Sequence, residues 1–309
     1  MKSIRVSISI AFVLILSLAA CTSKQEQTTQ TAVQDVAAYE ASINAWHQER
    51  EAKLKAEDGW LALAGLFWLN EGENTFGSAA GNDLVFPEGK IAARAGTFIL
   101  SGNEVTLQVH NKTAILVNNK QVTEAVVFER GTKDAPEMKY GSLKWYVIKR
   151  GNKYGIRLRD TQSDARLNFK GITRYPVTTD WRVEARLESG IFPKKIAITN
   201  VLGQTAQEES PGTLVFTVDG KEHRLDALGE GDSYFVIFAD KTNGTETYGA
   251  GRYLYADKPG ADGKIILDFN KATNPPCAFV PYATCPLPPK QNFLTIPVPA
   301  GEKSYEEAH

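Results

Sequence analysis

A proline-rich segment near the C-terminus limits the fold of this chain most strongly. The sequence contains 14 prolines, and more than half of them lie at or after Pro275. Each proline fixes its own backbone φ angle and removes one N–H donor, so the segment cannot form a helix. Aromatic side chains and two cysteines are interspersed with the prolines between Asp268 and Asn292, and such residues are usually buried. We therefore expect an ordered loop that packs against the rest of the protein.

The same segment resembles the hallmark of a known protein family. Together with residues 251–254 and 300–303, it is similar to DUF1684, a bacterial family of unknown function. A block between residues 58 and 74 is similar to the same family, so the resemblance covers nearly all of the chain that would remain after export. This resemblance implies no activity.

The N-terminus has the pattern of a lipoprotein signal peptide. Lys2 and Arg5 precede an apolar run over residues 6–20, and small residues stand directly before Cys21. The run is too short for a stable transmembrane helix. We expect residues 1–20 to be removed and Cys21 to carry the lipid, which would anchor the protein to a membrane of the cell envelope. A plain signal peptide with a coincidental cysteine is the alternative.

The residues after Cys21 predict where the anchored protein lies and where folding begins. In a Gram-negative host, Thr22 in place of aspartate favours the periplasmic face of the outer membrane. Residues 21–34 contain few side chains that could be buried, so we expect a disordered tether. From Asp35 onward, apolar residues at helical spacing predict one amphipathic helix that ends near Gly59 and packs against the chain's own sheet.

The rest of the chain predicts two β domains. Short apolar segments separated by turns indicate an N-terminal helix plus β-sandwich over residues 35–160 and a second antiparallel domain, sandwich or barrel, over 161–309. Expected strands of the first domain are 60–69, 83–87, 96–100, 105–107, 115–119 and 145–148. Expected strands of the second are 166–169, 181–187, 196–198, 213–218, 234–238, 253–255 and 265–267. The fold class is therefore mainly β.

The first domain resembles a forkhead-associated-type sandwich through its turns at residues 76–78, 117–119 and 141–143. Such domains bind phosphothreonine with an arginine and a Ser-x-x-His loop. Here Ser78 stands at the arginine position, and the matching loop contains only Lys90 and Arg94 as charged residues. We therefore expect a scaffold without phosphopeptide binding, although these two cations leave a residual anion site open.

Charge and residue types exclude several function classes. The formal net charge of −1 and a pI near 6.5 argue against a nucleic-acid partner. The four histidines have no metal-ligand spacing, which argues against catalytic zinc and a histidine-based triad. Residues 240–246 resemble the start of a calcium loop, but the Asn243-Gly244 pair favours a hairpin turn. We predict no cofactor and no metal.

Polar residues at strand ends beside the proline-rich loop form the candidate site. The candidate ligand-binding residues are Arg252, Tyr248, Asp240, Asp268, Asn270 and Asn274. In the functional interpretation Arg252 anchors an anion, and folding could add Arg157 and Lys303. In the structural interpretation Arg252 pairs with Asp268, and the asparagines bind loop carbonyls.

The sequence favours a non-catalytic envelope protein that binds a small ligand or another envelope component through its second domain. The alternative is an envelope hydrolase in which Asp240, Asp268 or Glu302 acts as acid or base. We also expect a disulfide between Cys277 and Cys285, because lipid on Cys21 leaves an even pair in an oxidising compartment.

Lipid attachment at Cys21 can be measured by incorporation of radiolabelled palmitate. We expect label in the wild type and none in Cys21→Ala, because the thiol is the acceptor. Equal labelling of both chains, or of neither, would contradict the assignment.

Overall fold

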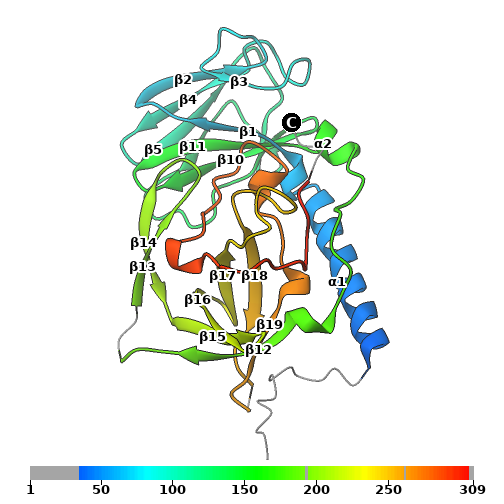
Figure 1. Cartoon of the computed structure of the whole chain (residues 1–309). Coiled ribbons are helices and arrows are strands. Elements are labelled where there is room, and N and C mark those ends of the chain that lie inside the picture. The colour runs from blue at the N-terminus through cyan, green and yellow to red at the C-terminus, as the bar shows by residue number, and fades with distance from the viewer. Residues whose placement is uncertain (1–34, 192–193, 261, 306–309) are drawn as a thin grey trace, which may run out of the picture.

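The computed structural model describes residues 35–191, 194–260 and 262–305. One long helix and two β domains make up this part of the chain (Figure 1). The predicted signal peptide, Cys21 and the predicted tether lie outside the described residues. Within the described ranges, no helix is both long and apolar enough to cross a membrane.

The first domain is a sandwich of two sheets, as the sequence predicts. The six-stranded sheet has the order β1 (Leu63–Trp68), β11 (Lys153–Asp160), β10 (Leu143–Arg150), β9 (Met138–Tyr140), β6 (Leu116–Val117) and β7 (Lys120–Gln121). The five-stranded sheet has the order β3 (Leu84–Val85), β2 (Gly72–Gly77), β4 (Gly96–Ser101), β5 (Glu104–Val109) and β8 (Glu124–Phe128). Phe76 and Phe98 stack at 4.5 Å between ring centroids, and Trp145 from the other sheet packs against Phe76. These rings fill the space between the sheets.

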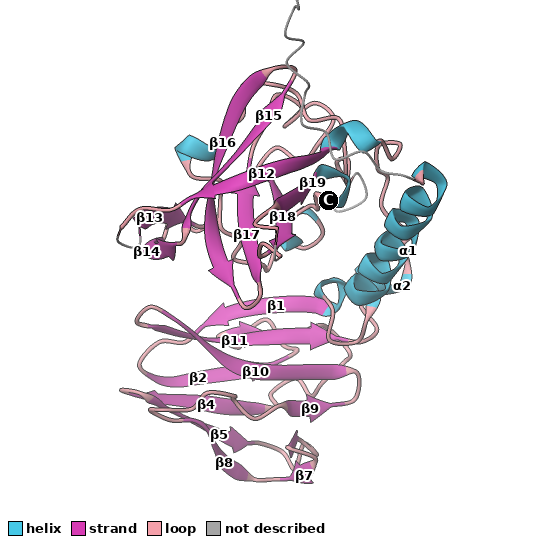
Figure 2. Ribbon diagram, turned by 90° about the horizontal axis from the view of Figure 1, so that it is seen from below, coloured by secondary structure: helices cyan, strands magenta, loops and turns pink. Residues whose placement is uncertain are grey.

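In the six-stranded sheet, the edge strand β1 lies next to the second domain (Figure 2). Along β11, Ile156 and Leu158 lie in the sandwich core. Side chains alternate along a strand, so Arg157 between them lies on the opposite face. That face would be exposed to water in an isolated sandwich, whereas here Arg157 shares a cavity with Phe235 and Tyr255 of the second domain.

The second domain is a nearly closed barrel, which decides between the two architectures left open by the sequence. Its sheet has the order β18 (Arg252–Asp257), β17 (Ser233–Phe238), β16 (Lys221–Glu230), β15 (Gly212–Val218), β12 (Arg182–Glu188) and β19 (Ile265–Asp268). The end strands β18 and β19 lie against each other. Phe216, Phe238 and Phe269 pack inside. A separate hairpin, β13 (Lys194–Thr199) with β14 (Thr205–Ser210), extends from one side.

One predicted strand is wrong. Residues 166–169 were expected to form a strand from their alternation, but the structure has the short helix α2 (Asp164–Leu167) there. The Ser163 hydroxyl caps this helix by accepting a hydrogen bond from the backbone N–H of Arg166. Local capping therefore outweighs a short alternating pattern.

The long helix α1 (Val36–Lys55) packs against the second domain and reaches the first at its C-terminal end. The Asp35 side chain caps it by accepting from the N–H of Ala38 at 2.9 Å. The Tyr39 hydroxyl donates to Asp268 at 2.8 Å. Near the other end, buried Leu54 joins a third hydrophobic cluster that also contains Leu61 and Ile237. The helix therefore joins the two domains.

The proline-rich segment is an ordered, packed loop, as predicted. It contains the short helices η4 (Pro276–Ala278) and η5 (Lys290–Asn292). Phe279 and Val280 are buried in the third hydrophobic cluster. The Asn292 amide donates to the carbonyls of Asp226 at 2.9 Å and Ile237 at 2.8 Å, so one side chain fixes the loop to two barrel strands.

A candidate ligand site between the two domains

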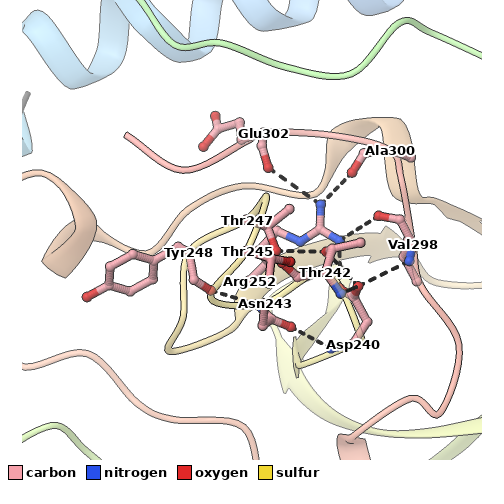
Figure 3. A network of polar contacts seen from close by, with 10 residues as sticks. All are labelled: Asp240, Thr242, Asn243, Thr245, Thr247, Tyr248, Arg252, Val298, Ala300 and Glu302. Carbon is pink, nitrogen blue, oxygen red and sulfur yellow. Dashed lines mark hydrogen bonds and ion pairs between the residues drawn. The ribbon is translucent and has the colours of Figure 1, made fainter. Parts of the chain in front are cut away.

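Arg252, the predicted anion anchor, is enclosed by the protein (Figure 3). Its side chain is 0% exposed, and its guanidinium donates to Asp240 Oδ2 at 2.7 Å. It also donates to the carbonyls of Val298, at 2.9 Å, and Ala300. Burial lowers the pKa of Arg252, and the Asp240 carboxylate acts in the opposite direction. The structural interpretation is correct about an ion pair but wrong about the partner, which is Asp240 and not Asp268.

The Asp240 carboxylate has enough protein donors to explain its burial. Its Oδ1 accepts from the hydroxyl of Thr242 at 2.6 Å and from the N–H groups of Thr242 and Val298 at 2.8 and 3.1 Å. Asn243 and Gly244 lie in the turn of the same loop, which agrees with the predicted turn. No group of three or more His, Cys, Asp or Glu side chains is placed to hold a metal ion within the described residues.

Asp268 and Asn270 belong to a separate network at the helix. The Asp268 carboxylate accepts from the Tyr39 hydroxyl, and burial followed by the Asp268 charge raises the pKa of that tyrosine. Asn270 accepts from the N–H of Thr178 at 3.1 Å and donates to its carbonyl at 2.8 Å. These two predicted site residues therefore fix α1 and residue 178 to the barrel.

Tyr248 and Asn274 lie closer to the proline-rich loop. The Tyr248 hydroxyl donates to the Cys277 carbonyl at 3.4 Å. Asn274 donates through its backbone N–H to Glu302 at 2.6 Å and through its amide to the Lys303 carbonyl at 2.7 Å. Its Oδ1 is buried and accepts no hydrogen bond from any residue that the structure describes. Of the six candidate residues, only Asn274 lines the cavity described next.

A cavity of about 370 Å³ lies where α1, the outer face of the first domain, the barrel and the proline-rich loop meet. Helix α1 supplies Arg50, and the six-stranded sheet supplies Arg150 and Arg157. The proline-rich loop adds Cys285 and neighbouring prolines. Its volume falls within the usual range of small-molecule sites, near the lower end.

Arg157 is the unusual residue of this cavity. It is only 6% exposed, yet it forms no hydrogen bond or ion pair with any residue that the structure describes. Its one close polar contact is a cation–π contact with Trp60, with the guanidinium carbon 5.6 Å from the ring centroid. Burying a cation without a carboxylate is unfavourable by several kcal/mol.

The two neighbouring arginines increase the positive charge. Arg150 donates to the carbonyl of Lys149 and forms no ion pair in the described part of the chain. Partial burial, and then the positive charge of Arg157, lower the pKa of Arg150. Arg50 differs, because its Nε lies 3.3 Å from Glu302 and its guanidinium also donates to the Asn274 carbonyl at 3.0 Å.

The described residues that line this cavity include no Asp or Glu. Asp240, Asp268 and Glu302, the carboxylates of the hydrolase alternative, lie in separate hydrogen-bond networks outside the lining. Besides the prolines and Cys285 of the loop, the apolar part of the lining is aromatic. The aromatic residues are Trp60, Phe235, Tyr253 and Tyr255. Chemically, the cavity can bind an anion beside a flat apolar group.

Other predicted cations lie elsewhere. Lys303 lies over the ring of Tyr175 at 4.5 Å and faces a different, more polar depression beside Glu51 and Glu246. In the forkhead-like half, Lys90 pairs with Asp160 at 2.6 Å, and Ser78 donates to the Ile91 carbonyl at 2.9 Å. The sequence suggested that folding could bring Arg157 and Lys303 to the candidate site. Of these two cations, only Arg157 lines the same cavity as Asn274.

Cys277 and Cys285 lie in contact, but the structure contains them as free thiols. The Cys277 N–H donates to Cys285 Sγ at 3.1 Å, and Cys277 Sγ donates to the Ala283 carbonyl at 3.3 Å. The hydrogen bond with the Cys285 sulfur lowers the pKa of Cys277, whereas that bond and burial raise the pKa of Cys285. The disulfide therefore stays a prediction.

The comparisons with known proteins give a family without an assigned activity. Residues 167–303 match the model of a family described as "Protein of unknown function (DUF1684)". No curated protein matches. The solution structure of an uncharacterised protein of Haloarcula marismortui is 34% identical, over 46% of this chain and 80% of that chain, with a TM-score of 0.38.

Two forkhead-associated domains are also similar, and both are far more distant. One comes from a study of phosphothreonine-dependent interactions; it is 19% identical over 30% of this chain and 92% of that chain, with a TM-score of 0.22. The other, the FhaA domain in complex with an intracellular domain, is 19% identical over 30% and 97%, also with a TM-score of 0.22. Both agree with the predicted resemblance, and similarity at this level implies no function.

Replacement of Arg252 tests the structural role assigned to it. Arg252→Met should destabilise the protein by about 3 to 5 kcal/mol, because it leaves the Asp240 carboxylate buried and unpaired. The measurement is urea unfolding. The double variant Arg252→Met/Asp240→Asn should lose less free energy of unfolding, because the buried Asp240 charge is also removed. If Arg252→Met is as stable as the wild type, the Arg252–Asp240 ion pair contributes nothing to stability.

Proposed function

Because the chain belongs to the DUF1684 family, whose description assigns no activity, we propose a function from the interdomain cavity itself. The protein is a lipid-anchored envelope protein that binds a small anion between its two domains. The observation that carries this proposal is Arg157, a buried arginine that pairs with no carboxylate among the described residues. It lies beside Arg150, which likewise forms no ion pair in that part of the chain.

The cost of burying Arg157 supports a bound anion. Most buried cations in proteins are paired, since desolvation costs more than packing returns. An anion between Arg150 and Arg157 would supply the missing negative charge and accept hydrogen bonds from their guanidinium groups. The site is formed by both domains, so the ligand would also hold them together.

The position of the site refines the sequence-based proposal. The sequence placed the ligand in the second domain around Arg252, whereas we now place it at the boundary and assign the anion contact to Arg157. The lipid on Cys21 and the envelope location remain part of the proposal, and they rest on the N-terminal sequence alone. The cavity gives no support to the hydrolase alternative, because none of the three carboxylates proposed as acid or base lines it.

Thermal unfolding with inorganic phosphate and sulfate as probes tests anion binding. Wild-type protein should unfold at a higher temperature with either anion than with chloride at equal ionic strength. A ligand at a hundred times its Kd stabilises by about 2.7 kcal/mol. Arg157→Gln should lose this shift, and without added anion it should be at least as stable as the wild type, because an unpaired buried charge is removed.

Arg159→Gln is the matched control. Arg159 lies two residues further along the same face of β11, over the ring of Tyr146, and does not line the cavity. The substitution removes the same charge as Arg157→Gln. The Arg159→Gln variant should nevertheless keep the anion-dependent rise in unfolding temperature. If both variants respond alike, or if the wild type shows no shift with any anion, the cavity is no anion site.

The predicted disulfide is tested by counting thiols in unfolded, unreduced protein purified under oxidising conditions. In an oxidising envelope compartment, Cys277 and Cys285 should be bridged, because their side chains are already in contact. The short ring contributes about 2 to 3 kcal/mol, mainly by restricting the unfolded chain. Two free thiols in a chain that lacks Cys21 or carries lipid there would contradict the bridge.

A further inference from the structure

Two features of the interdomain cavity narrow the chemistry of its ligand. They are a surplus of two positive charges and an aromatic surface. We propose that the ligand is a phosphomonoester of a ring compound, of the class of sugar phosphates and nucleoside monophosphates. This inference rests on the proposed function and specifies its ligand.

The charge surplus fits a dianion. Arg50 is neutralised by Glu302, which is buried and lies 3.3 Å from its Nε. Arg150 and Arg157 pair with no carboxylate in residues 35–191, 194–260 and 262–305. A phosphomonoester carries close to two negative charges at neutral pH, and its oxygens accept from planar guanidinium groups in bidentate geometry. A monoanion would compensate only one of these two positive charges.

The aromatic lining has room for a ring. Phe235 on β17 and Tyr255 on β18 stack with centroids 4.8 Å apart and an interplanar angle of 21°. Tyr255 is 49% exposed, so this stacked pair presents an accessible flat surface. Trp60 is already covered by the Arg157 guanidinium, which leaves the Phe235 and Tyr255 pair to contact the ring of the ligand.

A phosphorylated ring can reach the site from two sources. One is a soluble ester, and the other is the phosphorylated sugar headgroup of a lipid. Both sources present a phosphate group to Arg157 and a ring to Tyr255, so the proposal names the phosphorylated ring that they share. The experiment separates the sources.

The test is calorimetric titration of the full chain in detergent. The probes are glucose 6-phosphate, adenosine 5′-monophosphate, glucose 6-sulfate, glucose, inorganic phosphate and a phosphorylated glycolipid in the same detergent. We expect at least one ring phosphomonoester to bind about tenfold more tightly than inorganic phosphate, because the aromatic contact is added. Glucose 6-sulfate, a monoanion of similar shape, should bind about tenfold more weakly than glucose 6-phosphate. Tighter binding of the glycolipid than of the soluble esters would identify a lipid source.

Two variants separate the ring contact from the charge contact. Tyr255→Ala, at a half-exposed position, should weaken the ring esters about tenfold and leave inorganic phosphate unchanged. Arg150→Gln, at an exposed position, should weaken esters and inorganic phosphate alike. Circular dichroism confirms that each variant is folded.

The results also distinguish failure of this inference from failure of the proposed function. Equal affinity for inorganic phosphate and for every ester, glycolipid included, overturns the ring phosphomonoester while anion binding stands. Equal affinity for the sulfate and phosphate esters overturns the requirement for a dianion. Absence of binding by any anion, with Arg157→Gln no different from the wild type, overturns both.

Discussion

The buried pair of Arg252 and Asp240 organises the C-terminal part of this protein. Arg252 begins β18, and Asp240 follows the end of β17, so the pair closes the end of two neighbouring barrel strands. The same guanidinium binds the carbonyls of Val298 and Ala300, and it thereby fixes the last described segment against the barrel (Figure 3). A buried ion pair needs this many partners, because desolvation of both charges otherwise exceeds their attraction.

The position of that C-terminal segment then determines the interdomain cavity. The segment carries Glu302, whose carboxylate accepts from the backbone of Asn274 and pairs with Arg50 on α1. Asn274 in turn lines the cavity. A chain of direct contacts therefore connects the barrel pair, the C-terminal segment, the helix and the candidate site. The polar residues that the sequence grouped together mostly build this support, and few of them face the cavity.

The two arginine environments show why burial alone does not identify a site. Arg252 and Arg157 are both almost fully buried. The first has a carboxylate and backbone carbonyls, whereas the second has an aromatic face and no acceptor in the described part of the chain. A buried charge that the protein itself does not satisfy points to an external partner, because evolution of a purely structural core would favour an apolar residue there. This contrast is the physical basis for moving the candidate site from the barrel to the domain boundary.

The sequence by itself determined the local elements and the fold class of this protein. Proline chemistry predicted the ordered loop, helical spacing predicted α1, and short apolar segments predicted two β domains; each of these depends on residues close together in the chain. Alternation along β11 also places Arg157 on the outer face of the sandwich, but alternation cannot tell whether that face meets water or another domain. The burial of Arg157, the choice of Asp240 as the partner of Arg252, and the meeting of Arg50, Arg150 and Asn274 in one cavity are contacts between distant segments. Only the tertiary structure decided them, because they depend on how the barrel, the helix and the sandwich pack together.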